Sequence, residues 1–427
     1  MFLGVAAGRA STMMGRGAGA TLPGTIALRI QPGLLGALAA AREVAVVSAT
    51  NGKTTTTRML SAALAGTGGG VLSNTDGSNL ERGVLAALMK DRRRRCRTVA
   101  LEVDELALPA VAAQVHPDLF VLGNLSRDQL DRMTECKVIV RRWQQMFADV
   151  AAVAQGDGRQ VRVVANADDP LVTAAVLGPL NSDVPAGLDV TWVSVGQPWT
   201  GDAAACPRCS TPWRFDAASY SCLSCGFCRP DPSWELQGST VVGPGGLALA
   251  LKLGLPGRTN RANAVLAIAA SALRGIEPGT ALRAISELKN VDGRYATVQQ
   301  ADGVVRLLLA KNPAGWQEML TQHAEERRDG PGRPIVLALN ARTADGRDTS
   351  WIWDVPFEVL AGTPVMVSGE RAEDLAVRLC YAQVSFSQVR EPLAAVSAVR
   401  SHPGQAVDVL ATYTAFTAVQ RALGMKP

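Results

Sequence analysis

A glycine-containing loop between an apolar run and a helix-length segment constrains this chain more than any other feature. The run EVAVVS at residues 43–48 leads into ATNGKTTTTRML, where Gly52-Lys53-Thr54 matches the end of the phosphate-loop pattern G-x-x-x-x-G-K-[ST]. Backbone amides of such a loop, together with the positive end of the following helix dipole, hold nucleotide phosphates. Val47 stands where the pattern has its first glycine, which is a departure from it. The segment predicts a nucleotide-binding site.

The residues of this loop have separate expected roles. Lys53 is expected to reach the β- and γ-phosphates, and the hydroxyl of Thr54 is expected to bind Mg²⁺. The remaining phosphate contacts are expected from Thr50, Asn51, Gly52 and Thr55. Lys53 is also the predicted catalytic cation, because its charge offsets the charge that develops on a transferring phosphoryl group.

A second Mg²⁺ ligand is predicted from the apolar stretch TVALEVD, which ends in acidic residues. Glu102 is the candidate, whereas Asp104 favours a turn or the start of a helix. The alternative for Glu102 is an ordinary surface acid at the end of a strand.

Short apolar runs alternate with helix-length segments from residue 43 onward. Strands are predicted at 44–48, 71–73, 98–103, 119–123 and 161–165, and helices at 54–65, 131–150 and 263–273. This alternation predicts an α/β fold with a mostly parallel sheet covered on both faces. The length of 427 residues exceeds that of one ordinary core and favours roughly three domains.

The pattern restarts after VDGRY at residues 291–295. Strands are predicted at 303–310, 335–340 and 364–368, with a closing helix at 408–423. We therefore expect an N-terminal segment (1–42) packed on a central ATP-binding domain (43–292), followed by a C-terminal Rossmann-like α/β domain (293–427).

Four cysteines have the spacing of a zinc ribbon inserted at residues 201–235. They are Cys206, Cys209, Cys222 and Cys225, in the pattern C-x2-C-x12-C-x2-C. Cys228 is an alternative fourth ligand, although the symmetric C-x-x-C pairing favours Cys225. Four thiolates leave no open coordination position, so the predicted Zn²⁺ is structural. A nucleic-acid-binding ribbon is the rival interpretation, but no basic and aromatic face surrounds the cysteines.

Composition excludes several classes of protein. The longest charge-free run is 17 residues and contains four glycines, whereas a membrane-spanning helix needs about 20 mostly apolar residues. The N-terminus lacks the layout of a signal peptide, which favours the cytoplasm. A net charge of +5 is too small to indicate nucleic-acid binding.

Five motifs occur in the order seen in the Mur ligases, and the chain resembles that family. They are TNGKTTT, LEVDE, NLSRDQLD at 124–131, NADDP at 166–170 and LPGRTNRANA at 255–264. The resemblance implies ATP-dependent joining of an amine to a carboxylate of a peptidoglycan precursor through an acyl phosphate. Gln129 departs from the family motif D-H-L-D, and we expect no N-terminal domain of the kind that binds soluble precursors.

The inserted ribbon narrows the resemblance to the MurT family, the ligase-like subunits of lipid II isoglutaminyl synthases. The stretches at 307–320 and 338–354 are similar to the C-terminal domain of that family. The resemblance implies amidation of the α-carboxylate of D-glutamate in the lipid II stem peptide to D-isoglutamine. It also implies a GatD-like glutamine amidotransferase partner and peripheral contact with the inner face of the cell membrane.

A source of ammonia is not evident in this chain. Outside the ribbon only Cys96, Cys136 and Cys380 remain, and none lies in a glycine-flanked elbow typical of nucleophiles. The resemblance implies that the chain lends an aspartate to orient the histidine of its partner. Asp348 is the candidate, with Asp345 and Asp354 as alternatives.

The resemblance assigns three further positions. Asn260 is expected near the adenine, Arg294 near the ribose or phosphates, and Asn79 on the side of the substrate carboxylate. Two other hypotheses are a self-sufficient Mur-type or folylpolyglutamate-type ligase and a non-catalytic zinc-ribbon scaffold that binds nucleotide.

Overall fold

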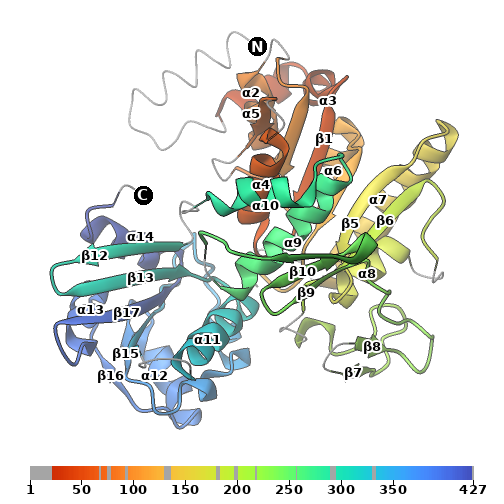
Figure 1. Cartoon of the computed structure of the whole chain (residues 1–427). Coiled ribbons are helices and arrows are strands. Elements are labelled where there is room, and N and C mark those ends of the chain that lie inside the picture. The colour runs from red at the N-terminus through yellow and green to blue at the C-terminus, as the bar shows by residue number, and fades with distance from the viewer. Residues whose placement is uncertain are drawn as a thin grey trace. The chain divides into compact units, whose positions relative to one another are not determined.

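The computed structural model describes most of the chain and divides it into two compact units. The described residues are 22–66, 69–74, 78–91, 95–128, 136–178, 183–196, 201–216, 219–255, 257–288, 295–328 and 333–425. The N-terminal unit comprises Met1–Leu125, Cys136–Gln197 and Ala203–Lys289 (Figure 1). The C-terminal unit comprises Ser126–Glu135, Pro198–Asp202 and Asn290–Pro427.

A nine-stranded sheet forms the centre of the N-terminal unit, with the order β11-β10-β9-β6-β5-β4-β1-β3-β2. The seven strands from β9 to β2 pair in parallel, whereas β10 and β11 are antiparallel. The strands are β1 (Glu43–Ser48), β2 (Val71–Ser73), β3 (Thr98–Glu102), β4 (Leu119–Leu122), β5 (Val161–Asn166), β6 (Leu188–Ser194), β9 (Trp234–Gln237), β10 (Thr240–Gly243) and β11 (Leu247–Ala250).

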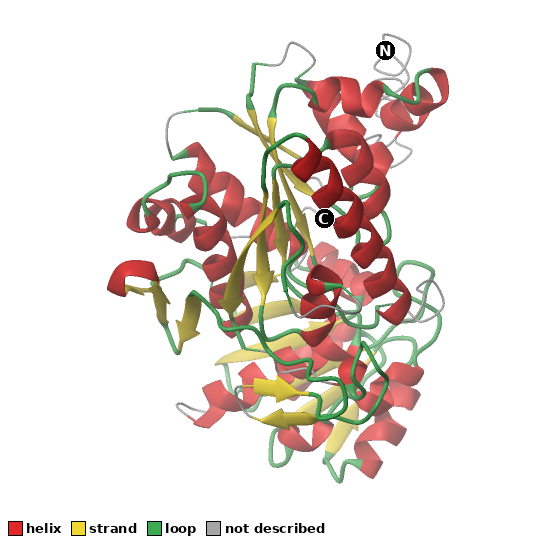
Figure 2. Ribbon diagram, turned by 90° about the vertical axis from the view of Figure 1, so that its right-hand side faces the viewer, coloured by secondary structure: helices red, strands yellow, loops and turns green. Residues whose placement is uncertain are grey.

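Helices cover both faces of this sheet (Figure 2). Strand β4 is buried along its whole length, as expected for a parallel strand between two helical layers. The helices are α2 (Leu22–Ile30), α3 (Leu34–Ala39), α4 (Lys53–Ala65), α5 (Glu81–Lys90), α6 (Leu108–Val115), α7 (Cys136–Gly156), α8 (Pro170–Leu177), α9 (Arg258–Ala272) and α10 (Pro278–Ser286). The turns are η1 (Gly201–Ala203) and η2 (Pro244–Gly246), and a separate hairpin pairs β7 (Arg214–Asp216) with β8 (Ser219–Ser221).

The C-terminal unit contains a six-stranded sheet with the order β12-β13-β17-β14-β15-β16. Only β12 is antiparallel to its neighbour. The strands are β12 (Tyr295–Gln300), β13 (Gly303–Leu309), β14 (Ile335–Ala338), β15 (Val365–Ser368), β16 (Phe386–Gln388) and β17 (Gly404–Ala411). The helical elements are α11 (Pro313–Arg328), η3 (Ser350–Asp354), η4 (Phe357–Leu360), α12 (Ala372–Tyr381), α13 (Pro392–Val399) and α14 (Tyr413–Ala422).

The α/β class with mostly parallel strands is confirmed, and most predicted strands end within one or two residues of the observed ones. The predicted helix at 408–423 is wrong at its start, because residues 408–411 belong to β17 and α14 begins at Tyr413. The last five residues of β17 are all buried, between β13 and β14, and this burial overrides the helical pattern. No helix among the described residues is long and apolar enough to cross a bilayer.

A buried charge network crosses the sheet of the C-terminal unit. Asp408 on β17 accepts two hydrogen bonds of 2.7 Å from the Arg306 guanidinium, and the ring Nδ1 of His323 lies 2.8 Å away. Burial alone raises the pKa of Asp408, but His323 and Arg306 outweigh it and hold that pKa well below its usual range. The network therefore stabilises the fold only while Asp408 is ionised.

Replacing this carboxylate is expected to destabilise the C-terminal unit. Asp408→Asn removes the buried carboxylate that pairs with both Arg306 and His323 and leaves Arg306 only its pair with Glu326, so the free energy of unfolding at pH 7 should fall by about 3–5 kcal/mol. The contribution of Asp408 in the wild type is present above the unfolded pKa of about 4 and is lost as pH falls below it. Urea unfolding between pH 7 and pH 3 tests both expectations.

The exposed pair of Arg342 and Glu370 supplies the control. Glu370→Gln should change the free energy of unfolding by less than about 1 kcal/mol, because solvent screens exposed charges. If Asp408→Asn and Glu370→Gln lowered the free energy of unfolding equally, the buried network would contribute no more than an exposed ion pair, which would contradict this prediction.

Candidate functional site

The phosphate loop connects the end of β1 to the first residue of α4. Gly52 has φ +85°, and a Cβ at this position would lie 2.5 Å from Oδ1 of Asn263 on α9. A side chain there would be strained by the backbone and blocked by Asn263. The positive φ therefore favours glycine at position 52, and a larger residue would also displace the Asn263 side chain.

Asn124 holds the loop in place through three hydrogen bonds to Thr50 and Asn51. Its backbone oxygen accepts from the Thr50 amide at 2.8 Å, and its side-chain Oδ1 accepts from the Asn51 amide at 2.9 Å. Its Nδ2 donates to the Asn51 carbonyl at 2.9 Å. Asn124 directly follows β4 and Gly123, so the motif NLSRDQLD begins with a residue that shapes the phosphate loop.

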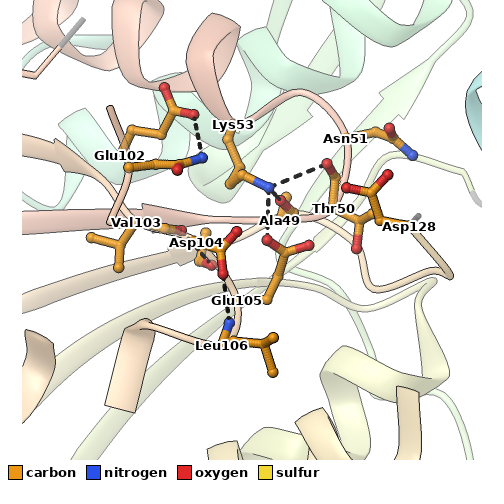
Figure 3. Close-up of polar contacts among 12 residues, drawn as sticks. Ala49, Thr50, Asn51, Lys53, Glu102, Val103, Asp104, Glu105, Leu106 and Asp128 are labelled. Atoms are coloured by element: carbon orange, nitrogen blue, oxygen red, sulfur yellow. Dashed lines mark hydrogen bonds and ion pairs between the residues drawn. The ribbon is translucent and has the colours of Figure 1, made fainter. Parts of the chain in front are cut away.

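Lys53 forms a buried ion pair with Glu105 (Figure 3). Its Nζ lies 2.7 Å from Oε2 of Glu105 and also donates to the Ala49 and Thr50 carbonyls. The side chains are 4% and 1% exposed. Glu105 is not among the residues predicted from the sequence, although the LEVDE motif contains it.

The pKa of Lys53 is raised above its ordinary value. Burial by itself lowers this pKa, but the charge and hydrogen bond of Glu105, with smaller contributions from Asp104 and Glu102, outweigh it. The ammonium therefore remains charged at neutral pH, as a phosphate-binding group requires.

Glu102 lies at the end of β3 and is 1% exposed, so the alternative of a surface acid is wrong. Its Oε1 accepts from Nδ2 of Asn79 at 3.3 Å, which brings two predicted site residues together. Its Oε2 is buried and has no hydrogen-bond partner among the residues that the structure describes. Oε1 of Glu105 is likewise buried and has no hydrogen-bond partner among the described residues.

These oxygens fit a Mg²⁺ ion, which prefers carboxylate, hydroxyl and phosphate oxygens. A buried carboxylate oxygen without a partner is costly, and a bound cation would remove that cost. Strand β3 pairs in parallel with β1, with Glu102 opposite Val47, so Glu102 and the loop lie at the same edge of the sheet. Glu102 is thus suited to hold the ion, and Thr54 stays a predicted ligand.

The structure places the side chain of Asn263 against the phosphate loop, near the predicted nucleotide residues. Asn260 lies in the first turn of α9 and is half-buried. Asn263, three residues later, is the residue that reaches Gly52. Residues three apart share a helix face, and this spacing was the available signal. Arg294, Gln129 and Asp131 lie outside the described residues.

The four predicted zinc ligands converge. Their sulfurs all lie within 4.8 Å of one another, with Cys206–Cys225 at 3.6 Å and Cys209–Cys222 at 3.4 Å. A tetrahedral ion with Zn–S distances of about 2.3 Å separates sulfurs by about 3.8 Å, so the cluster fits Zn²⁺. Cys228 is exposed and is not a member of the cluster.

The ribbon is attached to the loop between β5 and α8. The Tyr220 hydroxyl donates to the Ala167 carbonyl at 2.9 Å, and Arg229 pairs with Asp168 at 2.6 Å. Asp169 caps α8 and also accepts from the Leu125 amide at 2.8 Å. The motif NADDP therefore connects the ribbon to the segment that carries Asn124.

The three candidate acids of the C-terminal unit have different surroundings. Asp345 is buried and accepts from the Thr414 amide at 2.7 Å, so it braces the loop. Asp354 pairs with Arg127 at 3.0 Å. Asp348 is exposed, and hydrogen bonds from the Ser350 side chain and amide lower its pKa. Asp348 is thus an ionised carboxylate on the surface.

Family models match two parts of the chain. Residues 47–180 match the Mur ligase middle domain, and residues 309–416 match the MurT ligase C-terminal domain. The first match begins in β1 and contains the phosphate loop, and the second contains all three candidate acids.

Two curated relatives cover most of the chain. The lipid II isoglutaminyl synthase (glutamine-hydrolyzing) subunit MurT of Staphylococcus aureus is 29% identical, with 90% of this chain and 87% of the relative covered. The subunit of the same name from Streptococcus pneumoniae is 28% identical, with 99% and 97% covered. Among solved structures, a pseudomurein peptide ligase type C from Methanothermus fervidus has a TM-score of 0.65 at 16% identity, with 89% of this chain and 79% of that chain covered, and supports the fold alone.

The buried pair predicts how a Lys53 variant behaves. Lys53→Met should lose nucleotide-dependent turnover and also lose about 3–5 kcal/mol of stability, because Glu105 is left as an unpaired buried charge. The double variant Lys53→Met/Glu105→Gln should regain most of that stability while turnover stays absent. Urea unfolding and phosphate release measure the two effects, and a single variant as stable as the wild type would contradict the pairing.

The cysteine cluster predicts one Zn²⁺ per chain. Cys206→Ser should lose the metal and lower the melting temperature, because a structural site contributes folding free energy directly. Cys228→Ser is the matched control and should keep both metal and stability. Elemental analysis of reduced protein tests this, and retention of zinc by Cys225→Ser with its loss from Cys228→Ser would reverse the ligand assignment.

Proposed function

This chain belongs to the MurT group of the Mur ligase family, and we propose that it amidates the α-carboxylate of D-glutamate in the stem peptide of lipid II. ATP is the energy source, and D-isoglutamine is the product. The chain is an ATP-dependent amide-forming ligase, since the relatives that match most of it are lipid II isoglutaminyl synthase subunits. Because the substrate carries a lipid, we expect the chain to act at the inner face of the cell membrane as a peripheral protein.

The observation that carries the ligase step is the buried, charged Lys53 beside unpaired carboxylate oxygens. The loop amides and Lys53 bind the phosphates and keep the γ-phosphoryl group in position. Mg²⁺, when bound by Thr54 and Glu102, neutralises charge on the transferring phosphoryl group. Asn79, hydrogen-bonded to Glu102, is suited to the side of the substrate carboxylate.

The chemistry has two balanced steps. A carboxylate oxygen of the substrate forms a bond to the γ-phosphorus while the bond to ADP breaks, which gives an acyl phosphate. Ammonia then attacks the acyl carbon, phosphate leaves with the C–O bonding electrons, and the nitrogen loses a proton. The second step needs free ammonia, which is scarce at neutral pH.

Ammonia is proposed to come from a GatD-like glutamine amidotransferase. The names of the relatives include glutamine hydrolysis. Within this chain, His323 is committed to Asp408 and buried, so it is unsuited to serve as the base of a glutaminase. Asp348 presents an ionised carboxylate at the surface, where it suits orientation of the partner's histidine.

Assays with two nitrogen sources distinguish a role of Asp348 in ammonia supply from a role in the ligase step. Asp348→Asn should lower glutamine-dependent amidation by several orders of magnitude, about 10⁴-fold when a triad aspartate is the precedent. Activity with concentrated ammonium salt at raised pH should remain near that of the wild type. Assays of lipid II amidation with each nitrogen source measure this.

Asp354→Asn is the matched control, because it makes the same change at another partly exposed acid. It should leave both activities within a few-fold of the wild type. Equal loss with both nitrogen sources in Asp348→Asn would place this residue in the ligase step or the fold. Loss confined to Asp354→Asn would transfer the orienting role to Asp354.

A further inference from the structure

Three exposed apolar side chains lie together on the C-terminal unit. Trp353 on η3 is 50% exposed, and Val377 and Tyr381 on α12 are 51% and 74% exposed. Val377 and Tyr381 are four residues apart and share a helix face. The rings of Trp353 and Tyr381 are in edge contact, with centroids 5.2 Å apart. We call these three residues the aromatic patch.

The apolar residues that η3 contributes to the core are not those of the aromatic patch. Trp351 and Ile352, the residues before Trp353, are buried, and Trp351 packs against Trp316 with centroids 5.6 Å apart. The short helix η3 thus already supplies its apolar groups to the core. Trp353 is presented outward in addition to them.

Arg378 supports the aromatic patch from beneath. Its guanidinium lies 5.8 Å from the centre of the Trp353 ring and 5.4 Å from that of Phe357. It donates to the Val355 carbonyl at 2.8 Å and pairs with Glu358 at 2.9 Å. The Trp353 ring therefore contacts both Arg378 and Tyr381, and a side chain that is already packed loses less entropy when a partner binds it.

The aromatic patch is continuous with the segment that carries Asp348. The Thr349 hydroxyl donates to Asp374 in the first turn of α12 at 3.0 Å. Tyr381 lies seven residues further along the same helix, which is about 10 Å. A partner buries about 800 Å² on each side of a stable interface, and such an area includes both features.

We propose that the aromatic patch is the apolar anchor that holds the glutamine-hydrolysing subunit over Asp348. This inference rests on the proposed function, which requires that subunit to reach Asp348. Partly exposed Trp and Tyr side chains beside an arginine are typical of residues that dominate binding energy. A membrane surface is a poorer occupant, because the arginines beside the patch are paired with acids, Arg378 with Glu358 and Arg371 with Asp374, and do not offer anionic lipids an unpaired basic cluster.

Binding of the purified glutamine-hydrolysing subunit from the same organism tests this. Trp353→Ala and Tyr381→Ala should each raise its Kd by about 30-fold or more in calorimetry, as residues central to an interface do. Leu223→Ala, at an 84% exposed apolar residue of the ribbon, is the control and should not change the Kd. Melting temperatures should change little, because Tyr381 is mostly exposed and Trp353 is half-exposed.

Activity separates anchoring from orientation. Glutamine-dependent amidation by Trp353→Ala should fall at limiting partner and recover at saturating partner, whereas Asp348→Asn should not recover. Ammonium-dependent amidation should be unaffected in both variants. An unchanged Kd in both patch variants would overturn the anchor while leaving the proposed function intact.

Two further outcomes also decide the inference. Loss of a concentration-dependent dimer in the patch variants, with partner binding unchanged, would assign the patch to a second copy of this chain and overturn the anchor. Absence of partner binding by the wild type would overturn the anchor and the ammonia-supply part of the proposed function together. Absence of ammonium-dependent amidation would instead refute the ligase function.

Discussion

The buried ion pair between Lys53 and Glu105 sets the main constraint on the N-terminal unit. Removing two charges from water costs several kcal/mol for each ion, so the pair persists only where geometry and further hydrogen bonds offset that cost. Two carbonyls of the phosphate loop accept from Lys53, and Trp143 on α7 donates to the Glu105 carbonyl at 2.9 Å. Parallel pairing of β1 with β3 brings the two residues to one edge of the sheet. The ammonium of Lys53 is therefore charged before any phosphate binds, and its three donors are held by Glu105 and the Ala49 and Thr50 carbonyls.

Several motifs of the N-terminal unit contact the phosphate loop or the backbone next to it. Asn124 fixes the loop, Asn263 fills the space above Gly52, and Asp169 holds the backbone next to Asn124. The cysteine ribbon contacts the same NADDP loop through Tyr220 and Arg229. A structural metal in the ribbon would thus stabilise a loop that is connected, through Leu125, to the nucleotide site.

The C-terminal unit uses its acids for different tasks. Asp408 is enclosed by Arg306, Arg333 and His323 and stabilises the sheet, and Asp345 braces the loop that follows β14. Asp348 is left at the surface of that braced loop, near the aromatic patch. A carboxylate that must act on a partner's histidine needs this combination of exposure and fixed position, because orientation is lost if its loop moves.

Local patterns in the sequence were enough to predict the phosphate loop, the four converging cysteines and the parallel α/β class. Each depends on residues that are close in the chain, such as a strand followed by GKT or a pair of C-x-x-C turns. The sequence did not show that Glu105 pairs with Lys53, that Asn263 reaches Gly52, or that residues 408–411 form a central strand. Those features depend on which distant segments pack together and on how deeply each side chain is buried. Burial sets the cost of an unpaired charge, and only the tertiary structure determines burial.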